Sequence, residues 1–499
     1  MNQTIPAPRP AADSAKENAR RWLVLAVLGV AQLMVVLDAT IMNVALPTAQ
    51  HALGFSDSDR QWVVTAYALS FGSLLLLGGR LGDLLGRRTT FLIGLAGFAA
   101  ASAFGGAAQN FGMLVVARAA QGVFGALLAP AALGLLTTTF TDPRERAKAF
   151  GIFGALAGTG GAIGLLLGGG LTTYASWRWA LYINVGFAGV AMAGAAALLP
   201  RFVRTGAAHL DWVGTLTASA GLFSLVYGLS HAETGGWAST TTLGFLAAAV
   251  VLLAGFGWSQ TKVAHPLLPP RVVLDRDRAG AYLAMLVVGS GMFAVFLFLT
   301  YYLQATLGFS AIRTGVAFLP MVAALIATAQ VTSLVLLRQL GARVLVPTGM
   351  AISALGMSVL AQISLDSGYA AHVLPGLVVM GIGVGMVFAT AMQSAVSGVE
   401  PRDAGVASAM VNTVQQVGGS IGIALLGTVA GNAASGYLTG KGTPTPALLE
   451  AAAVHSYTTT FEWAGAILAV GAVLVASVLK SGGAIVHAPA IVAEPVLVH

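Results

Sequence analysis

The chain has 499 residues, of which 57% are hydrophobic and only 9% are charged. Soluble domains carry roughly 25% charged residues, so this composition excludes an ordinary soluble protein and predicts an integral membrane protein. The net charge of +7 would suit a nucleic-acid partner, but the basic residues lie between long apolar runs and are better explained as topological anchors. The chain has no cysteine, which excludes a disulfide framework and a thiolate metal site.

Long apolar runs predict fourteen membrane-spanning helices. An apolar run of about 18 residues or more can cross a membrane as a helix. The first run follows a polar tail, residues 1–21, and is too long for the core of a cleavable signal peptide, so we expect it to be retained. The composition of this tail and of a second one, residues 481–499, favours disorder. We expect spans at 22–46, 61–78, 91–109, 113–136, 149–171, 179–199, 212–230, 240–260, 281–303, 314–337, 344–364, 373–396, 405–430 and 460–479.

The first span contains a carboxylate, Asp38, well inside its apolar run. A carboxyl group held away from water can take up a proton on one side of the membrane and release it on the other. We therefore expect Asp38 to couple transport to protons; the alternative is a carboxylate that caps or pairs locally near the outer face. Asn43, in the same span, is expected to line a substrate cavity.

Ten residues rich in glycine and charge separate the second and third spans. Glycines allow a tight turn, and basic residues favour the anionic inner leaflet. The simplest alternative is a positive-inside anchor with incidental glycines. The residues expected to form a conformational latch here are Gly79, Asp83, Gly86, Arg87 and Arg88.

The fourth span carries a buried arginine, Arg118, followed by Gln121. A guanidinium does not deprotonate, so Arg118 is expected to hold an anionic group, pair with a carboxylate or tune a neighbouring proton site. The structural alternative is a clamp between helices. Gln121 and, in span twelve, Gln393 are further candidates for the substrate cavity.

The fifth span is rich in glycine, and its spacing predicts one helix face almost without side chains. Such faces let helices approach closely in lipid, which suits a seam where two bundles rock, although generic packing would also produce it. The residues of this face are Gly154, Gly158, Gly161 and Gly164, and the glycine motif continues to Gly168 and Gly169.

A similar glycine run, 418–427, occurs in span thirteen, which indicates two repeated halves of six spans with a two-span insert. Secondary transporters are commonly built from such repeats; two unrelated glycine-rich helices are the alternative. The predicted organisation is a first bundle over 22–200, an insert over 209–262, a cytoplasmic linker over 263–280 and a second bundle over 281–480.

The distribution of basic residues predicts the topology. If the N-terminus is cytoplasmic, the outside loops hold Arg60, Arg178, Arg313 and Lys441, and the other loops and tails hold nearly all the rest. Lys and Arg accumulate on the cytoplasmic side, so both termini are expected there, with the chain in the cell (inner) membrane. Glu462 begins span fourteen near the outer interface and is either a second proton-coupling group or a solvated residue.

The sequence offers no pattern for chemistry on a substrate. It has no HExxH motif, no GxSxG motif with a supporting context and no complete phosphate-binding loop. We therefore expect no catalytic residue, enzyme activity, metal site or cofactor. The expected partners are a hydrophobic small molecule, protons and the lipid bilayer, with no nucleic acid, and the chain is expected to be a monomer.

Several of these elements together resemble the fourteen-helix drug:proton antiporter branch of the major facilitator superfamily, a group of multidrug efflux transporters. They are the first-span segment 37–47, the loop 79–88, the Arg118-x-x-Gln121-Gly122 element, the span-five glycines and the segments 177–185 and 412–419. The resemblance covers residues 22–480. It implies an all-α fold with two six-helix bundles around a central cavity and two extra helices at the periphery. It also implies that Asp83 meets the start of span thirteen, near 403–405, when the cytoplasmic side is closed.

Two departures from the family pattern matter. Leu165 stands where the antiporter motif has proline, so a bend at this point of span five is in doubt. Span ten contains no carboxylate, which favours neutral, zwitterionic or monocationic substrates. The expected function is proton-coupled export of hydrophobic drugs or antibiotics by alternating access. A dedicated exporter of one endogenous metabolite and a proton-linked uptake facilitator remain as alternatives.

Overall fold

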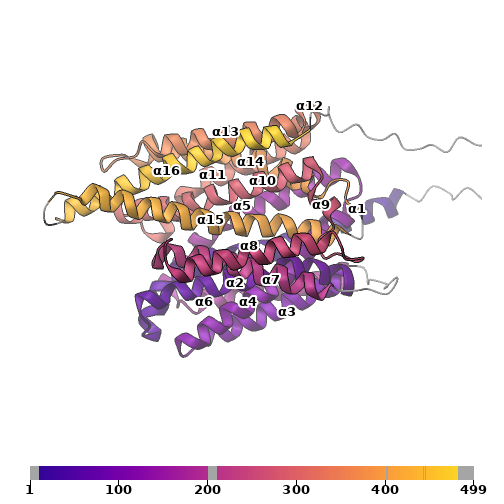
Figure 1. The fold of residues 1–499 in the computed structure, drawn as a ribbon. Helices are drawn as coiled ribbons and strands as arrows, with labels where there is room; N and C mark the ends of the chain where they lie inside the picture. Colours follow the sequence, from indigo (N-terminus) through magenta and orange to yellow (C-terminus); the bar gives the residue numbers. More distant parts are fainter. Residues whose placement is uncertain (1–10, 200–210, 401–402, 442, 444, 481–499) are drawn as a thin grey trace, which may run out of the picture.

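The computed structural model describes residues 11–199, 211–400, 403–441, 443 and 445–480, and within these residues helices joined by turns and loops make up the structure, with no strand (Figure 1). The first bundle consists of α1 (Ala11–Leu53), α2 (Asp57–Leu85), α3 (Arg87–Gly106), α4 (Phe111–Thr139), α5 (Pro143–Tyr174) and α6 (Trp179–Leu198). The insert consists of α7 (Trp212–Gly235) and α8 (Thr240–Gln260), and the linker contains the short helix α9 (Pro270–Val273).

The second bundle is also built from helices, with four π-helical segments in or next to them. Its elements are α10 (Arg276–Ala294), η1 (Val295–Leu299), η2 (Tyr302–Thr306), α11 (Ala311–Val331), η3 (Thr332–Leu336), α12 (Leu337–Leu340), α13 (Ala342–Leu360), η4 (Tyr369–Val373), α14 (Leu374–Val396), α15 (Ala404–Leu438) and α16 (Pro446–Val478).

The predicted spans all fall on helices. Thirteen described helical stretches are long and apolar enough to cross a membrane, and the fifth predicted span lies within the 32-residue helix α5. The predicted tails are described only in part: residues 1–10 and 481–499 lie outside the described residues, but α1 already begins at Ala11. The expectation of disorder up to residue 20 is therefore wrong from Ala11 onward.

Local sequence explains where the helices begin and turn. The Asn110 side chain accepts a hydrogen bond from the Met113 amide and caps α4, as Ser56 does for α2 by accepting from the Asp59 amide. The turn between α2 and α3 is a single residue, Gly86, at φ 89°. This left-handed backbone conformation favours glycine, so the chain reverses direction there without a longer loop.

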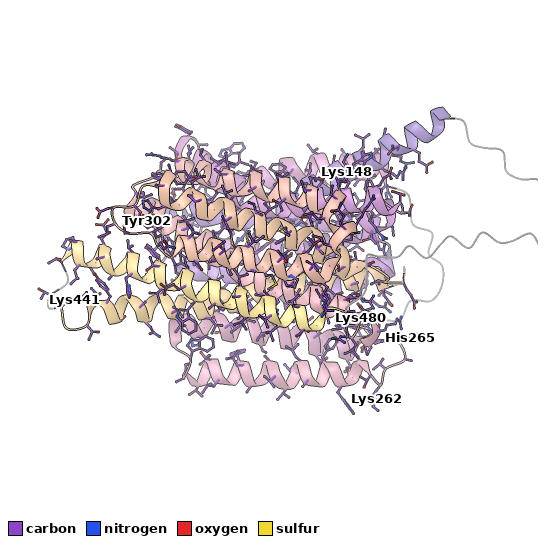
Figure 2. The ribbon with its side chains drawn as sticks, turned by 90° about the horizontal axis from the view of Figure 1, so that it is seen from above. Lys148, Lys262, His265, Tyr302, Lys441 and Lys480 are labelled. Atoms are coloured by element: carbon purple, nitrogen blue, oxygen red, sulfur yellow. The ribbon has the colours of Figure 1, made fainter. Side chains whose placement is uncertain are left out.

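The start of α1 at Ala11 and the end of α16 at Val478 lie at the same end of the molecule (Figure 1), which we call the termini end; the opposite end is the far end. Figure 2 shows Lys148, Lys262 and Lys480 at the termini end and Lys441 at the far end. The lysines thus divide between the two ends as the predicted topology requires.

The insert lies where α2 of the first bundle meets α15 of the second. Its helix α7 packs on α2 of the first bundle and on α15 of the second, while α8 packs on α7. Near the middle of this junction, a Cβ added at Gly72 of α2 would lie 3.9 Å from both Gln416 on α15 and Val226 on α7. At the far end, the Trp237 indole donates to the Thr428 hydroxyl of α15 over 2.7 Å. The insert is peripheral, as predicted, but it contacts both bundles.

Candidate functional site

A buried polar cluster occupies the interior of the first bundle, and we call it the Asp38 cluster: Asp38 on α1, Ser102 on α3, Arg118 and Gln121 on α4, and Asn184 on α6. Each of these residues is at most 1% exposed. Ser102 and Arg118 lie within about two turns of the far ends of their helices. The cluster therefore joins four helices around one carboxylate in the far half of the bundle.

An ion pair forms the centre of the cluster. Arg118 donates from Nη1 to Oδ2 of Asp38 at 2.5 Å. Its Nε donates to the carbonyl of Val63 at 3.2 Å, and its guanidinium lies 4.5 Å from the centroid of the Tyr67 ring. A buried ion pair needs such additional partners to offset the desolvation of both charges. The arginine is thus held firmly on three sides.

The second carboxylate oxygen of Asp38 is occupied by two amides. Gln121 donates from Nε2 at 2.9 Å and Asn184 donates from Nδ2 at 2.7 Å. Gln121 also donates to the Ser102 hydroxyl at 2.7 Å and accepts from Arg118 at 2.7 Å. Every group that contacts the carboxylate therefore donates a hydrogen bond to it, an arrangement that suits an acceptor.

The structure sorts the predicted site residues in an unexpected way. Asp38 and Arg118 meet, as one of the expected roles of Arg118 requires, but Gln121 belongs to their cluster rather than to a separate substrate cavity. Glu462 is exposed on α16 of the second bundle and does not join Asp38. Gln393 is buried on α14, and the side chain of Asn43 lies outside the described residues.

Sequence reasoning missed Ser102, Tyr67 and the role of Asn184. Ser102 and Tyr67 are ordinary residues of apolar helices, and Asn184 drew attention only as part of a motif. Carboxamide side chains are rare in the predicted spans, and this rarity could have pointed to Asn184. A buried amide needs hydrogen-bond partners, and a buried ion pair is the group most in need of such partners. Which helices meet around it depends on packing that local sequence does not encode.

The predicted latch loop lies at the contact between the bundles at the termini end. The Asp83 carboxylate covers Gly405 in the first turn of α15, where an added Cβ would come within 2.6 Å of both carboxylate oxygens. A Cβ at Gly79 would lie 2.6 Å from that of Ala409. Only glycine permits this approach of α2 and α15. The structure thus brings Asp83 to the part of α15 that the resemblance indicated, with the bundles closed together at this end.

The two arginines of the loop bind helix ends. Arg87 donates to the carbonyl of Gly134 at 2.9 Å and lies 3.4 Å from Asp83, while Arg88 donates to the carbonyl of Ala196 at 3.1 Å. Cations are favourable near the C-terminal ends of helices. The expected role of both arginines at the anionic leaflet stays a prediction, and in this structure they also fasten α4 and α6.

The linker provides a second tie at the same place. Arg271 of α9 donates to the carboxylate of Asp403, the residue that precedes α15, at 2.7 and 3.1 Å. Asp403 is 3% exposed, and it stands two residues before Gly405. The start of α15 is thus held by the linker on one side and covered by Asp83 on the other.

The span-five glycines meet two different neighbours of α5, which are α1 and the second bundle. A Cβ at Gly164 would clash with Thr40 of α1, whereas one at Gly161 would lie 2.8 Å from Phe296 of the second bundle. Gly154 faces Met392, with 3.7 Å to its sulfur. Gly168 packs on α1 like Gly164, and the surroundings of Gly158 lie outside what the structure describes. Both α1 and the second bundle can therefore approach α5 closely.

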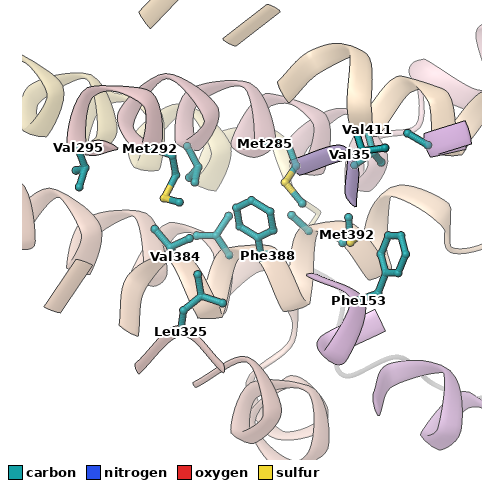
Figure 3. Packing of buried hydrophobic residues seen from close by; sticks show 14 of the residues in the cluster. Val35, Phe153, Met285, Met292, Val295, Leu325, Val384, Phe388, Met392 and Val411 are labelled. Atoms are coloured by element: carbon teal, nitrogen blue, oxygen red, sulfur yellow. The ribbon is translucent and has the colours of Figure 1, made fainter. Parts of the chain in front are cut away.

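Sulfur-containing and aromatic side chains gather where the bundles meet. Figure 3 shows Phe153 of α5 and Val35 of α1 in the same buried cluster as Met285 of α10 and Phe388 and Met392 of α14. Methionine is flexible and polarizable and adapts to ligands of different shapes. This part of the interface offers apolar, deformable contacts rather than a fixed pattern of hydrogen bonds.

The comparisons with known proteins agree with this architecture. Residues 28–423 match the model of the Major Facilitator Superfamily. A puromycin resistance protein of Streptomyces alboniger is 46% identical over 458 residues, covering 91% of this chain and 90% of that protein. A cephamycin export protein of Amycolatopsis lactamdurans is 39% identical over 409 residues, covering 81% of this chain and 84% of that protein.

A third relative and a solved structure extend the comparison. A tetracenomycin C resistance and export protein of Streptomyces glaucescens is 35% identical over 412 residues, covering 82% of this chain and 76% of that protein. The crystal structure of the human organic anion transporter MFSD10 superposes with a TM-score of 0.62 at 15% identity, covering 91% of this chain and 99% of that one. At this identity the likeness shows the fold alone.

Proposed function

The chain belongs to the Major Facilitator Superfamily, and from this premise we propose that it exports an antibiotic or another hydrophobic small molecule across the cell membrane in exchange for protons. The names of three relatives, which concern resistance to or export of puromycin, cephamycin and tetracenomycin, support the direction and the class of substrate. The family and the multi-pass architecture support a transporter rather than an enzyme.

The observation that carries the proton coupling is the Asp38 cluster. Among the described residues, Asp38 and Arg118 are the buried charged side chains in the interior of the membrane-spanning bundles away from their ends. Ionisable groups in such positions are costly and usually functional. We assign proton uptake and release to Asp38, and to Arg118 the role of holding the carboxylate in place.

The substrate class follows from the contact between the bundles. The methionines and phenylalanines around Met392 offer an apolar surface, and the stretch from Ala311 to Leu340 contains no carboxylate that would favour a dication. A neutral, zwitterionic or monocationic amphiphile suits these groups. A dedicated exporter of one endogenous metabolite would use the same surface, and a susceptibility panel in an efflux-deficient host distinguishes one substrate from many.

Proton coupling is tested by transport into everted membrane vesicles. We expect uptake of the drug to require a proton gradient, to stop on addition of an uncoupler and to survive depletion of ATP. Drug uptake that persists without a gradient would contradict the antiport proposal. A tag at residue 499 that is accessible only from the cytoplasmic side would support the topology that we propose, with both termini inside.

Alternating access is tested by a reversible disulfide cross-link. Because the chain has no cysteine of its own, the two introduced cysteines can pair only with each other within one molecule. A Cβ at Gly72 lies 3.9 Å from the Cβ of Gln416, within the range of about 3.5–4.5 Å found in disulfides. We expect oxidation of the double variant Gly72→Cys/Gln416→Cys to stop export and a reductant to restore it. The single variants are the controls. Full export by the oxidised double variant would show that α2 and α15 need not separate.

A further inference from the structure

Asn184 is the member of the Asp38 cluster whose amide oxygen, Oδ1, accepts no hydrogen bond from a described residue. Its Nδ2 donates to Asp38 at 2.7 Å, but its Oδ1 is buried and has no hydrogen-bond partner among the described residues. Leaving a buried acceptor unsatisfied costs the desolvation of that group without the gain of a hydrogen bond. The unpaired Oδ1 of Asn184 would be satisfied in a state of the cluster in which a neighbour donates a hydrogen bond to it.

We propose that Asn184 is the positioning residue that serves both protonation states of Asp38, by turning its amide when the carboxylate takes up a proton. This inference rests on the proposed role of Asp38 in proton coupling. In the ionised state, Nδ2 of Asn184 donates to Oδ1 of Asp38. In the protonated state, the amide makes a half-turn about its Cβ–Cγ bond, and its oxygen accepts the new O–H.

The proton itself has one favourable place on the carboxylate. Oδ2 of Asp38 is held by Arg118 at 2.5 Å, and a proton there would displace a charge-assisted hydrogen bond from a group that stays cationic. Oδ1 faces two neutral amides. An aqueous proton therefore forms an O–H bond with Oδ1, the carboxylate becomes neutral, and the same bond breaks when the proton leaves.

Of the two amides on Oδ1, only Asn184 can turn without loss. Gln121 is fixed at both ends, since its oxygen accepts from Arg118 at 2.7 Å and its nitrogen donates to Ser102 at 2.7 Å. A half-turn of Gln121 would point its NH₂ group at the guanidinium. A half-turn of Asn184 gives up one hydrogen bond and makes another.

The remaining surroundings of Asp38 do not replace this function. Helix α1 packs against α2, α4, α5 and α6. Among the described residues, the titratable or charged groups that face Asp38 from these helices are Tyr67 on α2 and Arg118 on α4. The charged residues of α5 lie at its termini end, between 144 and 148, and α6 presents the amide of Asn184.

Infrared difference spectroscopy of the full chain in lipid vesicles, titrated with pH and carrying isotope-labelled asparagine, tests the proposal. We expect a carboxylic acid band that is absent in Asp38→Asn, accompanied by a shift of one asparagine C=O band to lower frequency. That shift should vanish in Asn184→Leu. It should persist in Asn412→Leu, the matched control, because Asn412 lies on α15 and its amide donates to the Ser408 carbonyl.

The possible outcomes distinguish the role of Asn184 from the role of Asp38 in proton coupling. A carboxylic acid band that titrates while the asparagine band stays still, or an asparagine shift that survives Asn184→Leu, would overturn the role of Asn184 and leave Asp38 in place. The absence of any titrating band that depends on Asp38 would overturn the proton coupling itself, and this inference with it. We expect Asn184→Leu to lower the rate of export about tenfold, as the loss of one hydrogen bond to a charged group predicts. The loss should be present both at a pH where Asp38 is ionised and at a pH where it is protonated, because Asn184 serves both states.

Discussion

The two six-helix bundles have the same number of helices but bury different chemistry. The first bundle encloses Asp38 and Arg118 with their amide partners, each at most 1% exposed. Among the described residues of the second bundle, the buried charged side chain is Asp403, at the termini end, and the interior is filled with methionine, aromatic and aliphatic groups. Two halves of similar architecture have therefore divided the work: we assign the proton to one and most of the substrate contact to the other.

The largest effect is expected from removing the charge in the first bundle. Asp38→Asn keeps the size of the side chain and most of its hydrogen bonds but cannot release a proton, so proton-driven export should fall to the level of vesicles that lack the protein. Vesicle uptake at equal expression measures it, and binding of substrate to the purified variant is the control for folding. Export at the wild-type rate would remove Asp38 from the mechanism.

Substitutions of Arg118 test whether export needs the ion pair with Asp38 or only a side chain that fills the same space. Arg118→Ala leaves the Asp38 carboxylate buried without its cation, a loss of about 3–5 kcal/mol for a broken buried pair, and we expect export to be lost. Arg118→Lys keeps the charge but not the planar fork and should retain part of the rate. If Arg118→Ala exports normally, the arginine only fills space.

The second bundle should respond through the substrate rather than the proton. Met392→Ala removes a flexible side chain that is 2% exposed and faces Gly154, so substrate affinity should fall about tenfold. Truncation also costs about 2–5 kcal/mol of stability, for which Met392→Leu, with a similar volume, is the control. Proton uptake per substrate should not change. A changed number of protons per substrate would show that the second bundle also takes part in proton coupling.

Asp83 should affect the motion between the bundles. A carboxylate at a helix N-terminus contributes about 0.3–1 kcal/mol, and the contact with Gly405 exists only while the termini end is closed. Asp83→Asn should therefore slow turnover roughly two- to fivefold and leave substrate affinity unchanged. Turnover and binding measured on the same preparation decide this. A loss of affinity with normal turnover would place Asp83 at the substrate instead.

Glu462 should matter least. Its side chain is exposed on α16, on the same helix face as Val470 and Val473, and it belongs to the bundle that we do not assign to the proton. Glu462→Gln should change export by less than about twofold. A large effect would reveal a second proton-coupling group in the second bundle and contradict the division drawn above.

The sequence predicted the helices and the rare charges well because both are local properties. Asp38 and Arg118 stand out in apolar runs, and every predicted span lies on a helix. The two neighbours that the α5 glycines meet were not predicted, because Gly161 and Gly164 are three residues apart and lie only about 60° from each other on a helix. Which neighbour each one meets depends on α1 and on the second bundle. The use of Asn184 and Ser102 likewise depends on helices that are distant in sequence.

The position of α7 has a consequence for molecules dissolved in the bilayer. Because α7 packs on both α2 and α15, a lipophilic compound that diffuses in the plane of the membrane meets the insert before it reaches that junction. On the other side of the molecule, α5 packs directly on α11, where a Cβ at Gly315 would lie 2.7 Å from Leu166, and the insert does not extend there. Sideways access from the lipid is therefore screened by the insert along one flank of the transporter, whereas along the other flank the direct contact between α5 and α11 is what a compound in the bilayer meets.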